Sequence, residues 1–223
     1  MRRYLPFAIV AAVALATISS ATLLYRAKRP PALVMTKSGS AAEMKESGDI
    51  HARGNPNASI TLEEFGDFQC PPCGMLSEAI NQLEKDYRPN LRVIFHNFPL
   101  AVHAHAREAA LAAEAAGLQG RFWEMHDLLY REQSVWSKAT DVRVLLNSYA
   151  GILGLDLERF KKDVDSDQTK TRVDADQKQG SSLGVQNTPT IFLNNRVVDP
   201  KLLNPDALRA EIEEAVKAKH PSS

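Results

Sequence analysis

The stretch Glu64-Phe65-Gly66-Asp67-Phe68-Gln69-Cys70-Pro71-Pro72-Cys73 decides how the rest of the chain is interpreted. Cys70 and Cys73 are the only cysteines among the 223 residues. Their spacing brings two sulfurs within bonding distance across the first turn of a helix. Because no other thiol is present, the chain cannot form a network of structural disulfides, and its cysteines make a single potential redox couple. The pattern therefore indicates thiol–disulfide exchange.

The overall composition is that of an ordinary globular protein, with 44% hydrophobic and 24% charged residues. The chain has 27 basic and 27 acidic residues, and its formal net charge is +0. No basic excess points to nucleic acid, and no block of like charge suggests an interaction tail. We therefore expect no nucleic-acid partner.

The N-terminal segment, residues 1–25, has the pattern of a signal anchor or a signal peptide. Met1-Arg2-Arg3 is basic, and the 21 residues from Leu5 to Tyr25 carry no charge. As a helix this run would be about 31 Å long, which matches a bilayer core. It either stays in the membrane as an anchor or is cleaved near Ser19-Ser20-Ala21. Both interpretations place the rest of the chain in the periplasm or on the outer face of the cytoplasmic membrane, where disulfides persist.

The remaining chain divides into a linker, one domain and a short tail. Residues 26–54 are rich in proline, glycine and serine and are predicted to be a linker, residues 55–218 a domain, and residues 219–223 a tail. Apolar alternation predicts strands at 60–65, 91–98, 190–193 and 196–198. Helical patterns follow the cysteines at 73–87, fill an insertion at about 101–183, and close the domain at 205–217. The order predicts an α/β core with inserted helices.

The cysteine pair is predicted to begin a helix, and this setting gives its two sulfurs different roles. A thiolate, not a thiol, attacks a disulfide, and a free cysteine has a pKa of about 8.5. The N-terminus of a helix lowers that pKa through its unpaired N–H groups. We expect Cys70 to be exposed just before the helix as the attacking sulfur. Cys73, in the first turn, is expected to be more buried and to be the resolving sulfur.

Pro71 and Pro72 weaken the stabilisation of that thiolate. Proline has no N–H, so only the backbone N–H of Cys73 is left to donate to the Cys70 sulfur. A histidine at position 72 would add a positive charge, and this chain has proline there. We therefore predict a Cys70 thiolate that is less stabilised than in strongly oxidising proteins, whose pKa falls to about 3.5.

The same spacing also forms half of a zinc site, but zinc needs four ligands. The chain has no second cysteine pair, so histidines would have to supply the rest. His103 and His105 are two residues apart and cannot share one helix face. We expect no metal site.

Several motifs together resemble the DsbA-like thiol–disulfide oxidoreductases of the thioredoxin superfamily. The similarity covers roughly residues 50–218. It rests on the Glu64–Cys73 stretch and on a set of downstream segments, namely Asn97-Phe98-Pro99-Leu100 with His103, Phe122-Trp123-x-Met125-His126, and Thr188-Pro189-Thr190. The resemblance implies a thioredoxin-like fold with an inserted helical subdomain, preceded here by the N-terminal hydrophobic helix.

The resemblance also implies roles for individual residues. Cys70 matches the family's nucleophile and Cys73 its resolving cysteine. Pro189 matches the family's cis-proline, although an ordinary loop proline is the alternative, because cis bonds are only about 5–6% of X-Pro bonds in folded proteins. The backbone of Thr188 is expected to pair with an extended substrate peptide.

Two further groups of residues border the expected site. Glu64 lies six residues before Cys70, where the superfamily places a buried acid that exchanges a proton with the resolving cysteine. Strand alternation puts Glu64 on one face with Ile60 and Leu62, and predicts that Glu63 is solvated. Pro71 and Pro72 are expected to contact substrate. Asp67 and Gln69 also border the site, with no role assigned, while four aromatic residues are expected to be core rather than groove, namely Phe68, Phe98, Phe122 and Trp123.

The leading functional hypothesis is a dithiol oxidase of exported, cysteine-containing proteins. The resemblance implies reoxidation by a quinone-linked membrane oxidase, and no organic cofactor is needed because the disulfide is the redox group. A reductase or isomerase fed by a membrane electron donor is the alternative, although residues 26–54 are too short for an isomerase's dimerisation domain. A copper or metal chaperone that uses the two thiols as soft ligands is a third hypothesis.

Overall fold

The computed structural model of this protein describes residues 51–219. In this range five strands form one mixed sheet in the spatial order β1-β3-β2-β4-β5. The strands are β1 (Ala52–Gly54), β2 (Ile60–Gly66), β3 (Leu91–Asn97), β4 (Thr190–Leu193) and β5 (Arg196–Val197). The predicted α/β arrangement is confirmed.

The central strand β2 fixes the register of the sheet. It runs parallel to β3, with Ile60 opposite Leu91, and antiparallel to β4, with Phe65 opposite Thr190. Nearly every residue of β2 is buried, because helices cover both of its faces. The antiparallel pairing brings the end of β2 and the start of β4 to the same place in the molecule.

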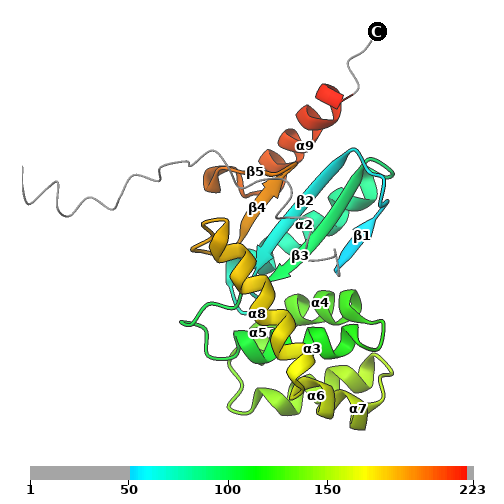
Figure 1. Cartoon of the computed structure of the whole chain (residues 1–223), viewed down its shortest axis with the longest axis vertical. Coiled ribbons are helices and arrows are strands. Elements are labelled where there is room, and N and C mark those ends of the chain that lie inside the picture. Colours follow the sequence, from blue (N-terminus) through cyan, green and yellow to red (C-terminus); the bar gives the residue numbers. More distant parts are fainter. Residues whose placement is uncertain (1–50, 220–223) are drawn as a thin grey trace, which may run out of the picture. The chain divides into compact units, whose positions relative to one another are not determined.

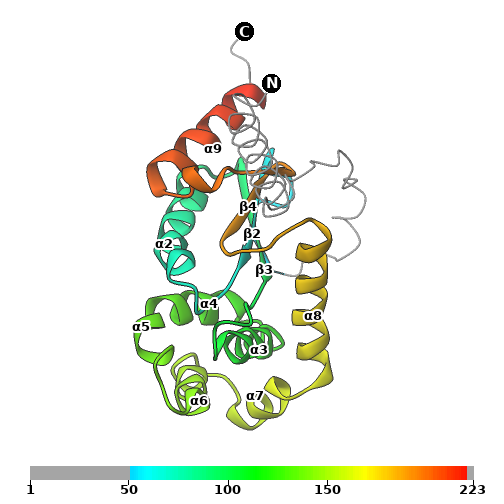
Figure 2. The ribbon, with the colours of Figure 1, turned by 90° about the vertical axis from the view of Figure 1, so that its left-hand side faces the viewer.

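Two helices cover one face of the sheet and a third covers the other (Figure 2). α2 (Pro71–Asp86) and α9 (Pro205–Lys219) lie on the first face, and α8 (Asp167–Ser182) lies on the second. The apolar stripe of α2 and the buried positions of α9 pack on the strands in one cluster, which includes Ile60, Leu62, Leu76, Ile80, Leu83, Val93, Leu208 and Ile212. Burial of these side chains, at about 1.5–3 kcal/mol each, holds this layer to the sheet.

Helices inserted between β3 and β4 form a block beyond the carboxyl ends of β2 and β3 (Figure 1). They are α3 (Ala106–Gly117), α4 (Phe122–Arg131), α5 (Gln133–Trp136), α6 (Val142–Ile152) and α7 (Leu157–Val164), followed by α8. Alanines of α3 pack closely against larger side chains such as Trp136 and Phe160. The block thus has a core of its own, next to the ends of the strands that lead to the cysteines.

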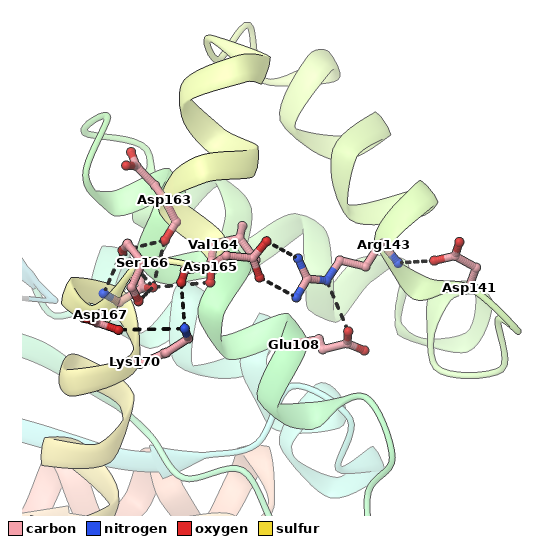
Figure 3. Close-up of polar contacts among 10 residues, drawn as sticks. Glu108, Asp141, Arg143, Asp163, Val164, Asp165, Ser166, Asp167 and Lys170 are labelled. Carbon is pink, nitrogen blue, oxygen red and sulfur yellow. Dashed lines mark hydrogen bonds and ion pairs between the residues drawn. The ribbon is translucent and has the colours of Figure 1, made fainter.

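Polar contacts join α3, α6 and the α7–α8 turn (Figure 3). Asp141 caps α6 by accepting a hydrogen bond from the Arg143 backbone N–H at 3.0 Å. The Arg143 guanidinium donates two hydrogen bonds to the Asp165 carboxylate, at 3.1 and 2.9 Å, and one to Glu108 of α3 at 3.2 Å. One side chain therefore ties three helices of the block together.

A buried cluster of charged groups lies under α8, and it corrects one prediction. Glu63, expected to be solvated, is only 6% exposed, because α8 covers its face of the sheet. The His96 ring lies between Glu63 and Asp176 of α8, with nitrogen–oxygen distances of 3.4 Å to each. Burial disfavours the charged imidazole, but the two carboxylates outweigh burial and raise the pKa of His96 to about 9. The cluster links α8 to the sheet.

The predicted elements agree with the structure in type, and the differences lie in short segments. The linker prediction for residues 26–54 was wrong at its end, because Ala52–Gly54 form the edge strand β1, paired with β3. Three residues are too few to show an alternating pattern. The four-residue helix α5 lies inside the insertion predicted as helical, while the 3-10 turn η2 (Pro200–Leu202) was not predicted, because it is too short to show a periodic pattern.

The predicted hydrophobic segment, residues 5–25, lies outside the described residues. Among residues 51–219, no helix combines the length and the apolar character needed to cross a bilayer.

The packing of α8 on the sheet gives a prediction at Gly180. A methyl group on Gly180 would lie 2.7 Å from a ring carbon of Phe98 and 2.8 Å from one of Phe65. Alanine favours helix by up to about 1 kcal/mol over glycine, but overpacking costs about 1–3 kcal/mol. We expect Gly180→Ala to lower the free energy of unfolding by about 1–2 kcal/mol, measured by urea titration.

The control for this variant is Ser181→Ala, on the exposed side of the same helix. It should leave the free energy of unfolding unchanged or slightly raised. Stabilisation by Gly180→Ala equal to that of the control would contradict the close packing of α8.

Candidate functional site

Cys70 is the N-cap of α2, directly after the loop that follows β2. Its backbone is extended, and its N–H donates to the Asp67 carbonyl at 3.0 Å. Pro71 and Pro72 occupy the first helical positions, where a missing N–H costs nothing. Both prolines are exposed on the surface beside Cys70, as a substrate contact would require.

The two thiols differ strongly in their ease of ionisation. Hydrogen bonds from the Cys73 thiol and from the Cys73 backbone N–H lower the pKa of Cys70 to about 6, against the opposing effects of burial and of the Asp67 charge. Burial and the hydrogen bond to Cys70 raise the pKa of Cys73 well above its ordinary value. At neutral pH, Cys70 is therefore mostly a thiolate, and Cys73 is a thiol that donates to it.

The predicted exposure of Cys70 was wrong, although its place before the helix is confirmed. Cys70 is 5% exposed and Cys73 is 0% exposed. The loop before β4 covers Cys70, whose sulfur lies 3.2 Å from the Thr188 carbonyl oxygen, a contact in which only the protonated form of Cys70 donates. A partner sulfur would therefore have to reach a side chain that is only 5% exposed.

The Thr188–Pro189 loop reaches the cysteines because of the sheet register. Thr190, the first residue of β4, pairs with Phe65 near the end of β2. The Thr188–Pro189 peptide bond is cis, as the resemblance implied. Both residues are half-buried, so the backbone at this point is partly accessible to a partner chain.

Glu64 is buried behind the cysteines, at 2% exposure, as strand alternation predicted. Its Oε1 atom has no hydrogen-bond partner among the described residues. Burial raises the pKa of Glu64 to about 8, with Arg53 opposing the shift and the Cys70 charge adding to it. A carboxyl group with that pKa can both accept and release a proton near neutral pH.

Asp67 and Gln69, which the sequence left without a role, anchor the rim of the site. The Asp67 carboxylate accepts hydrogen bonds from the Gln69 and Leu100 backbone N–H groups, at 2.7 and 2.8 Å, and contacts His103 Nδ1 at 2.7 Å. The Gln69 side chain accepts from the His105 N–H at 2.7 Å. The segment from Leu100 to His105 is thereby fixed beside the cysteines.

Gln133 of α5 is a site residue that sequence reasoning missed. Its side-chain amide donates to the Phe68 carbonyl at 2.7 Å and to the Cys70 carbonyl at 2.9 Å. It holds the backbone of the active turn from the side of the helical block. Gln133 lies 63 residues from Cys70 in the chain, so no local spacing indicated this contact.

The aromatic residues flanking the site are structural. Phe68, Phe98 and Phe122 are buried and Trp123 is half-buried, as expected for core rather than for an open groove. Phe68 and Phe122 belong to the larger buried cluster, and Phe98 packs in another one with Phe65 and Phe192.

Comparison with known proteins gives a consistent fold assignment. A family model described as thioredoxin matches residues 46–214. Oxidised BdbD from Bacillus subtilis is 26% identical, with a TM-score of 0.66 over 74% of this chain and 92% of that one. The thiol-disulfide exchange protein α-DsbA2 from Wolbachia pipientis is 19% identical, with a TM-score of 0.63 over 78% of this chain and 94% of that one. A periplasmic thioredoxin-like protein from Salmonella enterica serovar Typhimurium is 17% identical, with a TM-score of 0.63 over 80% and 98% of the two chains.

Curated relatives similar in sequence bear a different kind of name. Na(+)/H(+) antiporter NhaA 1 of Salinispora arenicola is 42% identical over 147 residues, which are 66% of this chain and 22% of that protein. The protein of the same name from Mycolicibacterium gilvum is 38% identical over 151 residues, 66% of this chain and 23% of that protein. The chain spans less than a quarter of the length of these relatives.

The buried carboxyl of Glu64 predicts a pH-dependent stability. Its folded-state pKa of about 8 exceeds the unfolded value of about 4.3, so the folded protein keeps a proton that the unfolded chain has lost. Between these two pKa values, stability falls as pH rises. Glu64→Gln should remove this slope and raise the free energy of unfolding at pH 8 by about 3–4 kcal/mol more than it does at pH 5.

Urea titrations at pH 5 and pH 8 measure the effect, with the exposed Glu78→Gln as the matched control. The control should keep the slope of the unmodified protein. At each pH, the free energy of unfolding of Glu64→Gln is compared with that of Glu78→Gln. If this difference is no larger at pH 8 than at pH 5, Glu64 is ionised in the folded state and the prediction is wrong.

Proposed function

This chain belongs to the DsbA-like thiol–disulfide oxidoreductases of the thioredoxin superfamily, and from this premise we propose that it is a dithiol oxidase of exported proteins. The observation that supports the proposal best is the asymmetry of its two thiols, because the Cys70 pKa is lowered while the Cys73 pKa is raised. A low pKa makes Cys70 a good leaving group, so a disulfide on it is readily passed to a substrate.

The reaction proceeds in two exchanges. A substrate thiolate attacks Cys70 Sγ of the oxidised pair, the Cys70–Cys73 bond breaks, and Cys73 takes the electron pair. The second substrate thiolate then attacks the substrate sulfur of the mixed disulfide. A substrate disulfide forms, and Cys70 leaves as the stabilised thiolate. Two electrons pass from the substrate to the pair, and no organic cofactor takes part.

Glu64 supplies the proton that the Cys73 thiolate takes up in the first exchange. Cys73 leaves as a thiolate in a buried place, where a negative charge is costly. A protonated Glu64 beside it can give up its proton, since its pKa of about 8 keeps it mostly protonated at pH 7. The proton returns to Glu64 when Cys73 is oxidised again.

Substrate recognition falls to the backbone around the cysteines. Thr188 is half-buried beside the Cys70 sulfur, and its backbone would pair with an extended substrate segment. Pro189 would pack against the sulfurs, and the exposed Pro71 and Pro72 would contact the substrate from the other side. Such contacts suit unfolded cysteine-containing chains, because backbone pairing depends little on which side chains the substrate carries.

The domain, which includes the edge strand β1, would act outside the cytosol, directed there by residues 1–25 and separated from them by the linker that begins at residue 26. The basic start and the uncharged run of 21 residues support this placement. Reoxidation would then need a membrane partner, for which a quinone-linked oxidase has the right chemistry.

A reductase fed by a membrane electron donor is the second candidate. The Cys70 pKa of about 6 lies between the values of about 7 for thioredoxin and about 3.5 for DsbA. Pro71 and Pro72 leave the thiolate with fewer donors, which favours this alternative. The direction of electron flow separates the two candidates.

Trapping with Cys73→Ser tests the exchange. Without the resolving sulfur, Cys70 should hold substrates as mixed disulfides, seen on non-reducing gels as adducts that a thiol reagent removes. Cys70→Ser is the matched control, since the remaining Cys73 is fully buried and should form no adducts. Adducts on Cys70→Ser, or none on Cys73→Ser, would reverse or remove the assigned roles.

A further inference from the structure

The hydroxyl of Tyr130, on α4, is buried without a hydrogen-bond partner among the described residues. The residue is only 6% exposed. A buried hydroxyl that makes no hydrogen bond destabilises a protein, and phenylalanine would fill the same space without that cost. A role outside folding would explain a hydroxyl at this position.

The close approach of Gly66 places this hydroxyl at the end of β2, and Tyr130 belongs to the buried cluster that also contains Cys73. A methyl group on Gly66 would lie 2.9 Å from the Tyr130 hydroxyl oxygen. Burial is the main cause of the raised pKa of Cys73, and the backbone of the next residue, Asp67, opposes that shift. The hydroxyl therefore lies beside Gly66, one residue from the backbone that acts on Cys73.

Glu64 lies on the same face of β2 as the Gly66 position that contacts the Tyr130 hydroxyl. Side chains at positions 64 and 66 point to the same face of β2, since the side-chain period of a strand is two. The Oε1 atom of Glu64 is, like the Tyr130 hydroxyl, buried and unpartnered among the described residues. Tyr130 shares a buried cluster with Cys73, and the charge of Glu64 acts on Cys73, so both unpartnered atoms belong to the part of the core around the resolving cysteine.

Electrostatic effects on Tyr130 agree with this placement. Burial is the main reason that the Tyr130 pKa is raised well above its ordinary value, and the Cys73 charge acts next, followed by Glu64. A tyrosine in this setting stays protonated, so it is available as a hydrogen-bond donor whenever Cys73 carries charge.

We propose that Tyr130 donates a hydrogen bond to the Cys73 thiolate and, with Glu64, controls the proton of the resolving cysteine. This inference rests on the proposed exchange at the Cys70–Cys73 pair. When an attacking thiolate breaks the Cys70–Cys73 bond, Cys73 leaves with the electron pair, accepts the Tyr130 hydrogen bond, and then takes a proton from Glu64. In the reverse step, Cys73 gives its proton to Glu64 and attacks Cys70, and the partner sulfur leaves as a thiolate.

Tyr130→Phe isolates the hydroxyl. The ring packs against Phe68 and His126, with centroid distances of 5.0 and 4.9 Å, and phenylalanine keeps those contacts. The variant should unfold at the same or a higher urea concentration. Tyr149→Phe, which removes the hydroxyl of another buried tyrosine, on α6, is the matched control.

The rate at which glutathione opens the oxidised pair is the kinetic readout. Loss of a hydrogen bond to a charged group should slow this step by about tenfold in Tyr130→Phe, with no change in Tyr149→Phe. In a Cys73→Ser background, the alkylation rate of Cys70 by iodoacetamide should be the same with Tyr130 or Phe at position 130.

A titration independent of exchange completes the test. In a Cys70→Ser background, the ultraviolet absorbance of the Cys73 thiolate should appear at a pH about one unit higher when Tyr130 is replaced. Unchanged opening by glutathione together with an unchanged titration overturns the inference. Equal slowing in Tyr149→Phe, or slower Cys70 alkylation in the Cys73→Ser background, also overturns it, because the effect would then be general.

The two proposals fail in different ways. If the oxidised protein exchanges with neither glutathione nor a dithiol peptide, yet Tyr130→Phe still shifts the Cys73 titration, the proposed function is wrong and the hydrogen bond is real. If exchange is normal and Tyr130→Phe changes neither readout, only the role of Tyr130 is wrong.

Discussion

The antiparallel pairing of β2 with β4 is the constraint on which the site depends. It places Thr190 opposite Phe65, so the two residues before β4 reach the loop between β2 and α2. The Thr188 carbonyl then lies 3.2 Å from the Cys70 sulfur, although 118 residues separate them in the chain. The inserted helices leave this pairing intact because they depart from the end of β3 and return at the start of β4.

Where β4 meets the loop between β2 and α2, the surroundings shift the pKa values of Cys70 and Cys73 in opposite directions. Cys70 sits at the helix N-cap, where the Cys73 thiol and N–H favour its charge, while burial opposes the charge of Cys73. The buried Glu64 adds an exchangeable proton on the side of Cys73. Position in the fold therefore gives the two cysteines different pKa values, in line with the attacking and resolving roles proposed for Cys70 and Cys73.

Local patterns in the sequence predicted most of the helices and strands, and also the positions of Glu64, Cys70 and Cys73 in the site. Alternation around Glu64 and the cysteine spacing are patterns that each span only a few residues, and β2 and α2 lie where these patterns predicted them. The Thr188–Pro189 bond is cis, as the family resemblance implied. Glu63 was misplaced because its burial comes from α8, more than a hundred residues later. Gln133 and Tyr130 were missed for the same reason, since α4 and α5 reach the cysteines only through tertiary packing.

Electrons are proposed to flow from substrate thiols to the Cys70–Cys73 disulfide, and the reduction potential of this pair tests that direction. The equilibrium between the Cys70–Cys73 pair and a glutathione buffer gives its reduction potential directly. Because the Cys70 thiolate is stabilised, though by fewer donors than in the strongest oxidants, we predict a potential between about −200 and −120 mV. A potential near −270 mV, that of thioredoxin, would mean a poor oxidant and contradict the dithiol oxidase.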